Sequence, residues 1–87
     1  MKTVIELIRD LLLSDDRYNL VKEWVAVDSD GGVFTYTEKP MVNRYGRHEY
    51  SSANRFEHLG NINPDLFDLK KCVFSRREII VELAKVM

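Results

Sequence analysis

Apolar residues near the N-terminus recur every three or four positions, which is the period of an amphipathic helix. Thr3 and Glu6 have the spacing of a capping box, in which each side chain binds a backbone N–H of the other residue. We therefore predict a helix from Thr3 to Leu13. The residues of its apolar side are Val4, Ile5, Ile8, Leu11 and Leu12.

A second capping box near the C-terminus, Ser75 followed by Glu78, predicts a helix from Arg76 to about Lys85. Phe74 lies before this box at the spacing of a hydrophobic staple with Ile79. The following apolar residues predict one stripe that packs on the rest of the protein. They are Ile79, Ile80, Leu83, Val86 and Met87.

Between the helices, two runs rich in Val, Trp, Phe, Tyr and Thr flank the Asp/Gly cluster of residues 28–32, which is typical of a β-hairpin. We expect strands near residues 22–27 and 33–39, ended by Pro40, which has no N–H to donate. Residues 55–61 predict a third strand. The expected fold is α+β: residues 1–87 form a single domain with a small antiparallel sheet of about three strands packed against N- and C-terminal helices.

Composition narrows the class of protein. The 87 residues are 45% hydrophobic and 31% charged, which fits one small globular domain. No apolar run approaches the roughly 20 residues that span a bilayer, and the N-terminal segment lacks the features of a signal peptide. The lone Cys72 fits a reducing compartment. We therefore expect a cytoplasmic protein with no membrane partner.

Charge is unevenly distributed along the chain. Residues 1–38 carry 8 acidic and 4 basic side chains, whereas residues 39–87 carry 6 acidic and 9 basic ones.

The periodicity of apolar positions is lost from residue 41 to residue 54, which predicts a long irregular connection. This stretch and the residue after it combine cations with flat rings, as protein interfaces and nucleic-acid sites do. The candidate partner-binding residues are Arg44, Tyr45, Arg47, His48, Tyr50 and Arg55. A solvated loop whose Tyr rings fold back over the sheet is the other interpretation.

A second basic run surrounds the start of the C-terminal helix. Lys70, Lys71, Arg76 and Arg77 lie where free backbone N–H groups can bind a phosphate and arginine can add forked hydrogen bonds. The helix dipole disfavours the two arginines in the first turn. Pairing with Asp65, Asp68 or an acidic residue of the first helix, or simple solvation, would equally account for these cations.

The sequence gives little support for catalysis, and it predicts no cofactor and no metal site. It has no glycine-rich phosphate loop and no nucleophile with a partner base. Asp28 and Asp30 alternate as in a calcium loop, but Val33 occupies the position of the required glycine and Lys39 that of the last ligand. Neither His48 nor His58 has a neighbour at metal-ligand spacing. We expect a protein that is not an enzyme.

Residues 27–40 read VDSDGGVFTYTEKP, and FEHLG at 56–60 and LFDLK at 66–70 follow. Together with residues 24–26 these segments resemble small uncharacterised proteins encoded by tailed bacteriophages, over about half the chain; Leu69 stands where that pattern has Trp. The resemblance implies a phage accessory protein in the host bacterial cytoplasm that binds and modulates or inhibits a host or defence protein. Binding of an anionic ligand, nucleic acid or nucleotide, through the basic residues is the alternative.

Overall fold

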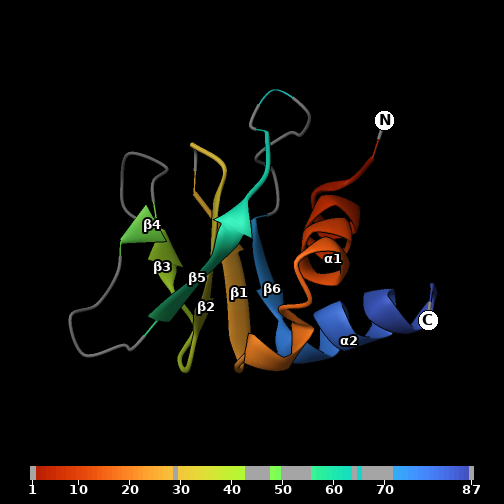
Figure 1. The fold of residues 1–87 in the computed structure, drawn as a ribbon. Helices are drawn as coiled ribbons and strands as arrows, with labels where there is room; N and C mark the ends of the chain where they lie inside the picture. Colours follow the sequence, from red (N-terminus) through yellow and green to blue (C-terminus); the bar gives the residue numbers. More distant parts are fainter. Residues whose placement is uncertain are drawn as a thin grey trace.

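A four-stranded antiparallel sheet forms the centre of the computed structural model, in the order β5-β2-β1-β6 (Figure 1). Its middle strands are β1 (Trp24–Val27) and β2 (Gly32–Tyr36), and its edge strands are β5 (Phe56–Asn61) and β6 (Val73–Ser75). The predicted α+β class is confirmed. The fourth strand is β6, which pairs with β1 and leads directly into the C-terminal helix.

The structure describes residues 2–28, 30–42, 48–49, 56–63, 65 and 72–86. For residues 41, 42, 48, 49 and 56 it describes the backbone alone.

Both predicted helices are present, and both lie on one side of the sheet (Figure 1). Each of α1 (Val4–Ser14) and α2 (Arg76–Ala84) begins with the expected capping box, Thr3 with Glu6 and Ser75 with Glu78. A short 3₁₀ turn, η1 (Tyr18–Leu20), follows α1. In the described part of the chain, neither helix has the length and apolar character that crossing a bilayer requires.

The hairpin between β1 and β2 turns at a glycine, as its sequence predicts. Gly31 has φ 93°, and its N–H donates to the Asp28 carbonyl at 2.9 Å. The Asp28 N–H in turn donates to the Gly32 carbonyl at 2.8 Å. This is the hydrogen bonding of a short hairpin loop closed by a glycine bulge, in which residues other than glycine are disfavoured at the positive φ.

The hydrophobic core lies between the helices and the sheet face that they cover. Ile8 and Leu12 of α1 are 0% exposed, and Ile79 of α2 is 1% exposed. The buried core cluster is completed by residues of the other elements and of the helix ends. These are Val4, Val25, Val27, Val33, Leu59, Ile62, Phe74 and Leu83. Alternation along the strands therefore directs one face of the sheet toward the helices.

A second, two-stranded sheet lies on the side of the main sheet away from the helices (Figure 1). It pairs β3 (Met41–Val42) with β4 (His48–Glu49) in antiparallel register. The prediction of an irregular connection from residue 41 to residue 54 was therefore wrong at these two strands. Strands of two residues are too short to produce a visible alternation of apolar and polar positions.

Thr35 provides the first testable prediction. Its side chain is 0% exposed; its hydroxyl accepts a hydrogen bond from the Lys22 N–H (2.7 Å) and donates to the Trp24 carbonyl (2.9 Å). Thr35→Val keeps the shape of the side chain but removes both hydrogen bonds. We therefore expect the free energy of unfolding, measured with urea, to fall by about 1–3 kcal/mol. Thr35→Ser keeps the hydroxyl and should lose only about 1 kcal/mol, the contribution of one buried methyl group. Equal stability of the valine variant and the parent would contradict this role.

Candidate functional site

Most of the residues predicted to bind a partner fall outside the described part of the chain. These are Arg44, Tyr45, Arg47, Tyr50 and Arg55, together with Lys70 and Lys71 of the alternative anion site. His48 is in β4, paired with Val42. Arg76 and Arg77 are fully described, and both are exposed on the first turn of α2. The candidate site that the structure describes is therefore built on α2.

The first turn of α2 already uses much of its hydrogen-bonding capacity. The Glu78 carboxylate accepts from the Ser75 N–H at 2.8 Å, and Ser75 Oγ accepts from the Glu78 N–H at 3.2 Å. The Arg76 N–H donates to the Glu23 carbonyl at 2.9 Å. A phosphate at this terminus would have to compete with these bonds and with the negative charge of Glu78. An anion would therefore depend on the arginine side chains more than on the backbone.

The exposed side of α2 differs from the predicted stripe. Ile79 and Leu83 are buried, as expected, but Ile80 is 49% exposed and Val86 51% exposed. Glu82, which lies between Ile80 and Val86 in the sequence, is buried, with 6% of its surface exposed. The prediction that Ile80 and Val86 pack on the sheet was therefore wrong, because the helix turns Glu82 inward; Met87 lies outside the described residues.

Glu82 is buried because it has two cationic partners. Its carboxylate accepts a hydrogen bond from Arg9 Nη1 at 3.0 Å and forms an ion pair with Lys85 Nζ, also at 3.0 Å. The side chains of Arg9 and Glu82 are only 13% and 8% exposed, so this pair joins α1 to α2 where little water reaches it. Breaking such a pair leaves a charge uncompensated, which is costly. The pair therefore fixes how the two helices lie against each other.

Arg9 also connects Glu82 to Asp10. The Arg9 guanidinium lies 3.0 Å from Asp10 Oδ1, and Lys2 binds the other oxygen of the same carboxylate. The hydrogen bond from Lys2, followed by the one from Arg9, lowers the pKa of Asp10. The hydrogen bond to Asp10 likewise raises the pKa of Arg9. One chain of ion pairs thus joins α1 to α2, in the order Lys2, Asp10, Arg9, Glu82 and Lys85.

This lowered pKa predicts how stability depends on pH. Because the folded state lowers the pKa of Asp10, its stabilisation is present above the unfolded-state pKa of about 3.9 and is lost as the pH falls through the folded value. Asp10→Asn should reduce stability at neutral pH by no more than about 1 kcal/mol, because the pair is partly exposed to water. Melting temperatures of variant and parent should converge toward pH 2. A constant difference from neutral to acid pH would contradict this assignment.

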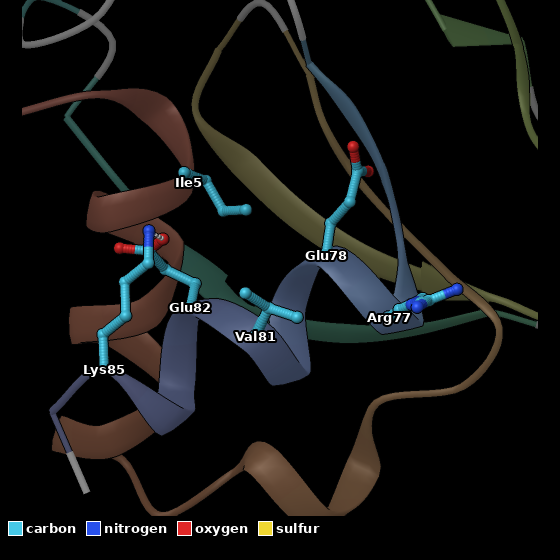
Figure 2. Close-up of a pocket in the computed structure, with 6 residues that line it drawn as sticks. All are labelled: Ile5, Arg77, Glu78, Val81, Glu82 and Lys85. Carbon is cyan, nitrogen blue, oxygen red and sulfur yellow. Dashed lines mark hydrogen bonds and ion pairs between the residues drawn. The ribbon is translucent and has the colours of Figure 1, made fainter.

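A shallow groove of about 330 Å³ runs along α2 where α1 packs against it. In Figure 2, Ile5 reaches from α1 toward α2, Glu82 and Lys85 lie at one end and Arg77 lies at the other. The lining residues are Ile5, Arg77, Glu78, Val81, Glu82 and Lys85. The groove therefore has apolar side chains between charged ends, and it contains one of the arginines predicted to bind an anion.

Cys72 is the single cysteine of the chain. Burial, and then the nearby Asp28 charge, raise the pKa of the Cys72 thiol, which lowers its thiolate fraction. The Cys72 side chain is partly buried and packs against the core. Among the described residues, no three His, Cys, Asp or Glu side chains are grouped so that they could hold a metal ion.

Sequence reasoning missed Val81, Glu82 and Ile5 as groove residues. The signal that could have found Val81 is the sequence of α2 itself, in which apolar residues occupy three consecutive positions, 79–81, so that one helix face cannot bury them all. The burial of Glu82 has no such local signal, because its partner Arg9 is 73 positions away.

Comparisons with protein-family models, curated proteins and solved structures found no match to this chain. The resemblance to tailed-phage proteins stays a prediction.

Proposed function

We propose that this protein is a non-enzymatic accessory protein of the phage type, which binds a host or defence protein in the bacterial cytoplasm and modulates or inhibits it. The observation that carries the proposal is the apolar surface of α2. Ile80, Val81 and Val86 are 49%, 53% and 51% exposed, although the helix already contributes Ile79 and Leu83 to the core. Ile80 and Val81 are consecutive in α2, and contiguous exposed apolar side chains are typical of surfaces that bind another protein.

The basic, aromatic segment of residues 44–55 is the second part of the proposed contact surface. Its candidate residues are Arg44, Tyr45, Arg47, His48, Tyr50 and Arg55. Tyrosine and arginine are enriched among the side chains that dominate binding energy at protein interfaces. The strands before and after residues 43–47, β3 and β4, belong to the two-stranded sheet and not to the four-stranded one.

Binding of nucleic acid or a nucleotide is the alternative function. It is supported by the exposure of Arg76 and Arg77, neither of which forms an ion pair with another described residue. Phosphate binding releases counterions, so its affinity should fall steeply with added salt, whereas an interface anchored by apolar and aromatic side chains should weaken far less.

Affinity purification from the native bacterial host, followed by mass spectrometry and reconstitution with the purified partner, tests the proposal. We expect one specific protein that forms a stoichiometric complex, measured by size-exclusion chromatography with light scattering. Arg47→Ala combined with Tyr50→Ala should weaken this complex at least about tenfold if the segment supplies hot-spot residues. Thr37→Ala combined with Lys39→Ala, at exposed positions after β2, is the matched control. Recovery of nucleic acid without a specific protein would favour the alternative.

A further inference from the structure

Strand β5 forms one edge of the four-stranded sheet, and it is the longest of the four strands. The outer side of an edge strand has backbone N–H and C=O groups that can pair with the edge of another molecule. Many proteins prevent such pairing with a lysine or a proline in the strand itself. The sequence of β5, FEHLGN, contains neither residue. Protection of this edge therefore depends on other features of the fold.

The side chain of Arg17 lies against the β5 edge. Its Nη1 group donates to two consecutive carbonyls of the strand, that of His58 at 3.3 Å and that of Leu59 at 3.5 Å. Consecutive carbonyls of a regular strand point to opposite sides, so one donor reaches both only where the strand is irregular. The register of β5 against β2 shifts at this place, which leaves Leu59 as an extra residue between His58 and Gly60. The guanidinium therefore occupies carbonyl groups at a bulge of the edge strand.

Backbone hydrogen bonds hold Arg17 in this place without using its side chain. Asp16 follows the end of α1 with a positive φ of 54°, and the Arg17 N–H donates to the Leu12 carbonyl at 2.9 Å. This is the hydrogen bonding of a left-handed helix end, the Schellman motif. The Arg17 carbonyl accepts from the Leu20 N–H at 3.0 Å. We therefore expect the turn after α1 to persist when the Arg17 side chain is replaced.

The charge of Arg17 opposes the addition of another strand at this edge. Arg17 forms no ion pair with any other residue that the structure describes. A strand that bonds to β5 at the bulge has to displace the guanidinium or bury it, and burial of a charge without a counter-ion is costly. The residues of β5 offer no comparable obstacle. In an antiparallel pair of β5 strands with Leu59 opposite Leu59, Glu57 lies opposite Asn61, so like charges do not meet.

We propose that Arg17 caps the outer edge of β5 and thereby prevents a second copy of the chain from adding its own β5 to the sheet. Without the guanidinium, two β5 strands pair antiparallel and form one continuous sheet across the two copies. The capped edge does not involve α2, so this inference does not depend on the proposed function.

Sedimentation-velocity ultracentrifugation of the full chain over a range of concentrations tests this proposal. Arg17→Ala removes the guanidinium, and we expect it to self-associate at least about tenfold more tightly than the parent. Arg17→Lys keeps a cation at the edge and should associate no more than the parent. Arg77→Ala is the matched control, because it removes a cation from an exposed position on α2, and it should also associate no more than the parent.

Hydrogen exchange measured by mass spectrometry locates the contact. In Arg17→Ala the amides of β5 should exchange at least about tenfold more slowly at high than at low protein concentration, because the added strand protects them. Combining Arg17→Ala with Glu57→Lys places a lysine in the strand itself and should restore the weak association of the parent. Circular dichroism shows whether each variant is folded. If Arg17→Ala does not fold, Arg17→Gln, which keeps a longer side chain without the charge, takes its place with the same expected result.

Several outcomes would overturn the capping proposal. An uncharged variant at position 17 that associates no more than the parent would do so, as would an Arg17→Lys variant that associates as tightly as Arg17→Ala. Protection that appears on α2 instead of β5 would place the contact elsewhere. Association that is unchanged by Glu57→Lys, or a parent chain that already pairs through β5, would equally contradict the role of Arg17.

Discussion

Ile8→Ala is expected to lower the free energy of unfolding by about 2–5 kcal/mol, the range for truncating a fully buried isoleucine. Ile8 is 0% exposed in the middle of α1 and belongs to the core between the helices and the sheet. Small domains are stable by about 5–15 kcal/mol, so the loss is a large fraction of the total. Urea denaturation followed by circular dichroism measures it, and the melting temperature should fall by roughly 10–30 °C.

Ile80→Ala is the matched control, because it makes the same substitution on the other helix at a residue that is 49% exposed. We expect a change within about 0.5 kcal/mol, as for most surface substitutions. The pair of variants also tests the observed exposure of Ile80 against the apolar stripe predicted from the sequence, in which Ile80 packs on the sheet. Equal losses for the two variants would favour the stripe and contradict the burial that the structure assigns.

The helices and the central hairpin could be predicted because their signals are local. Thr3 with Glu6 and Ser75 with Glu78 are three residues apart, and each capping box forms as expected. Gly31 likewise takes its positive φ within a turn of adjacent residues. Contacts between residues so close in the sequence depend little on the rest of the fold, so they can be predicted from the sequence alone.

The features that could not be predicted depend on partners distant in sequence. Strand β6 has three residues, and it becomes a strand by pairing with β1, for example through Phe74 opposite Val25. Glu82 is buried because α1 brings Arg9 to it across 73 positions. Glu82 follows Ile79 by three positions, so helical spacing puts it beside the buried face, but its carboxylate is buried there only because Arg9 pairs with it.

The candidate site also has one part that could be predicted from the sequence and one part that could not. The exposed cations Arg76 and Arg77 were predicted from composition and from their position at a helix start. The groove was not, because it requires α1 and α2 to pack side by side with Ile5 near Val81. The predicted contact residues between 44 and 55 remain a prediction that binding experiments must test.

Gly60→Ala is expected to cost about 2–5 kcal/mol, because it combines backbone strain with overpacking of the core. Gly60, in β5, has φ 144°, a conformation that residues with a side chain rarely adopt. A Cβ atom there would lie 2.7 Å from Leu11 Cδ1 and 3.2 Å from Leu11 Cγ. The Leu11 side chain must therefore shift where it packs against the core. Thermal and urea unfolding of the purified variant measure the loss.

Leu11→Ala, alone and combined with Gly60→Ala, separates the two causes. Removing the Leu11 side chain relieves the steric overlap but leaves the positive φ, so the cost of Gly60→Ala should be smaller in the Leu11→Ala background than in the parent, though not zero. The remaining cost measures the backbone strain, and the difference between the backgrounds measures the coupling between β5 and α1. An unchanged cost in both backgrounds would show that Leu11 does not contact this position, and would contradict the packing of α1 on the β5 edge of the sheet.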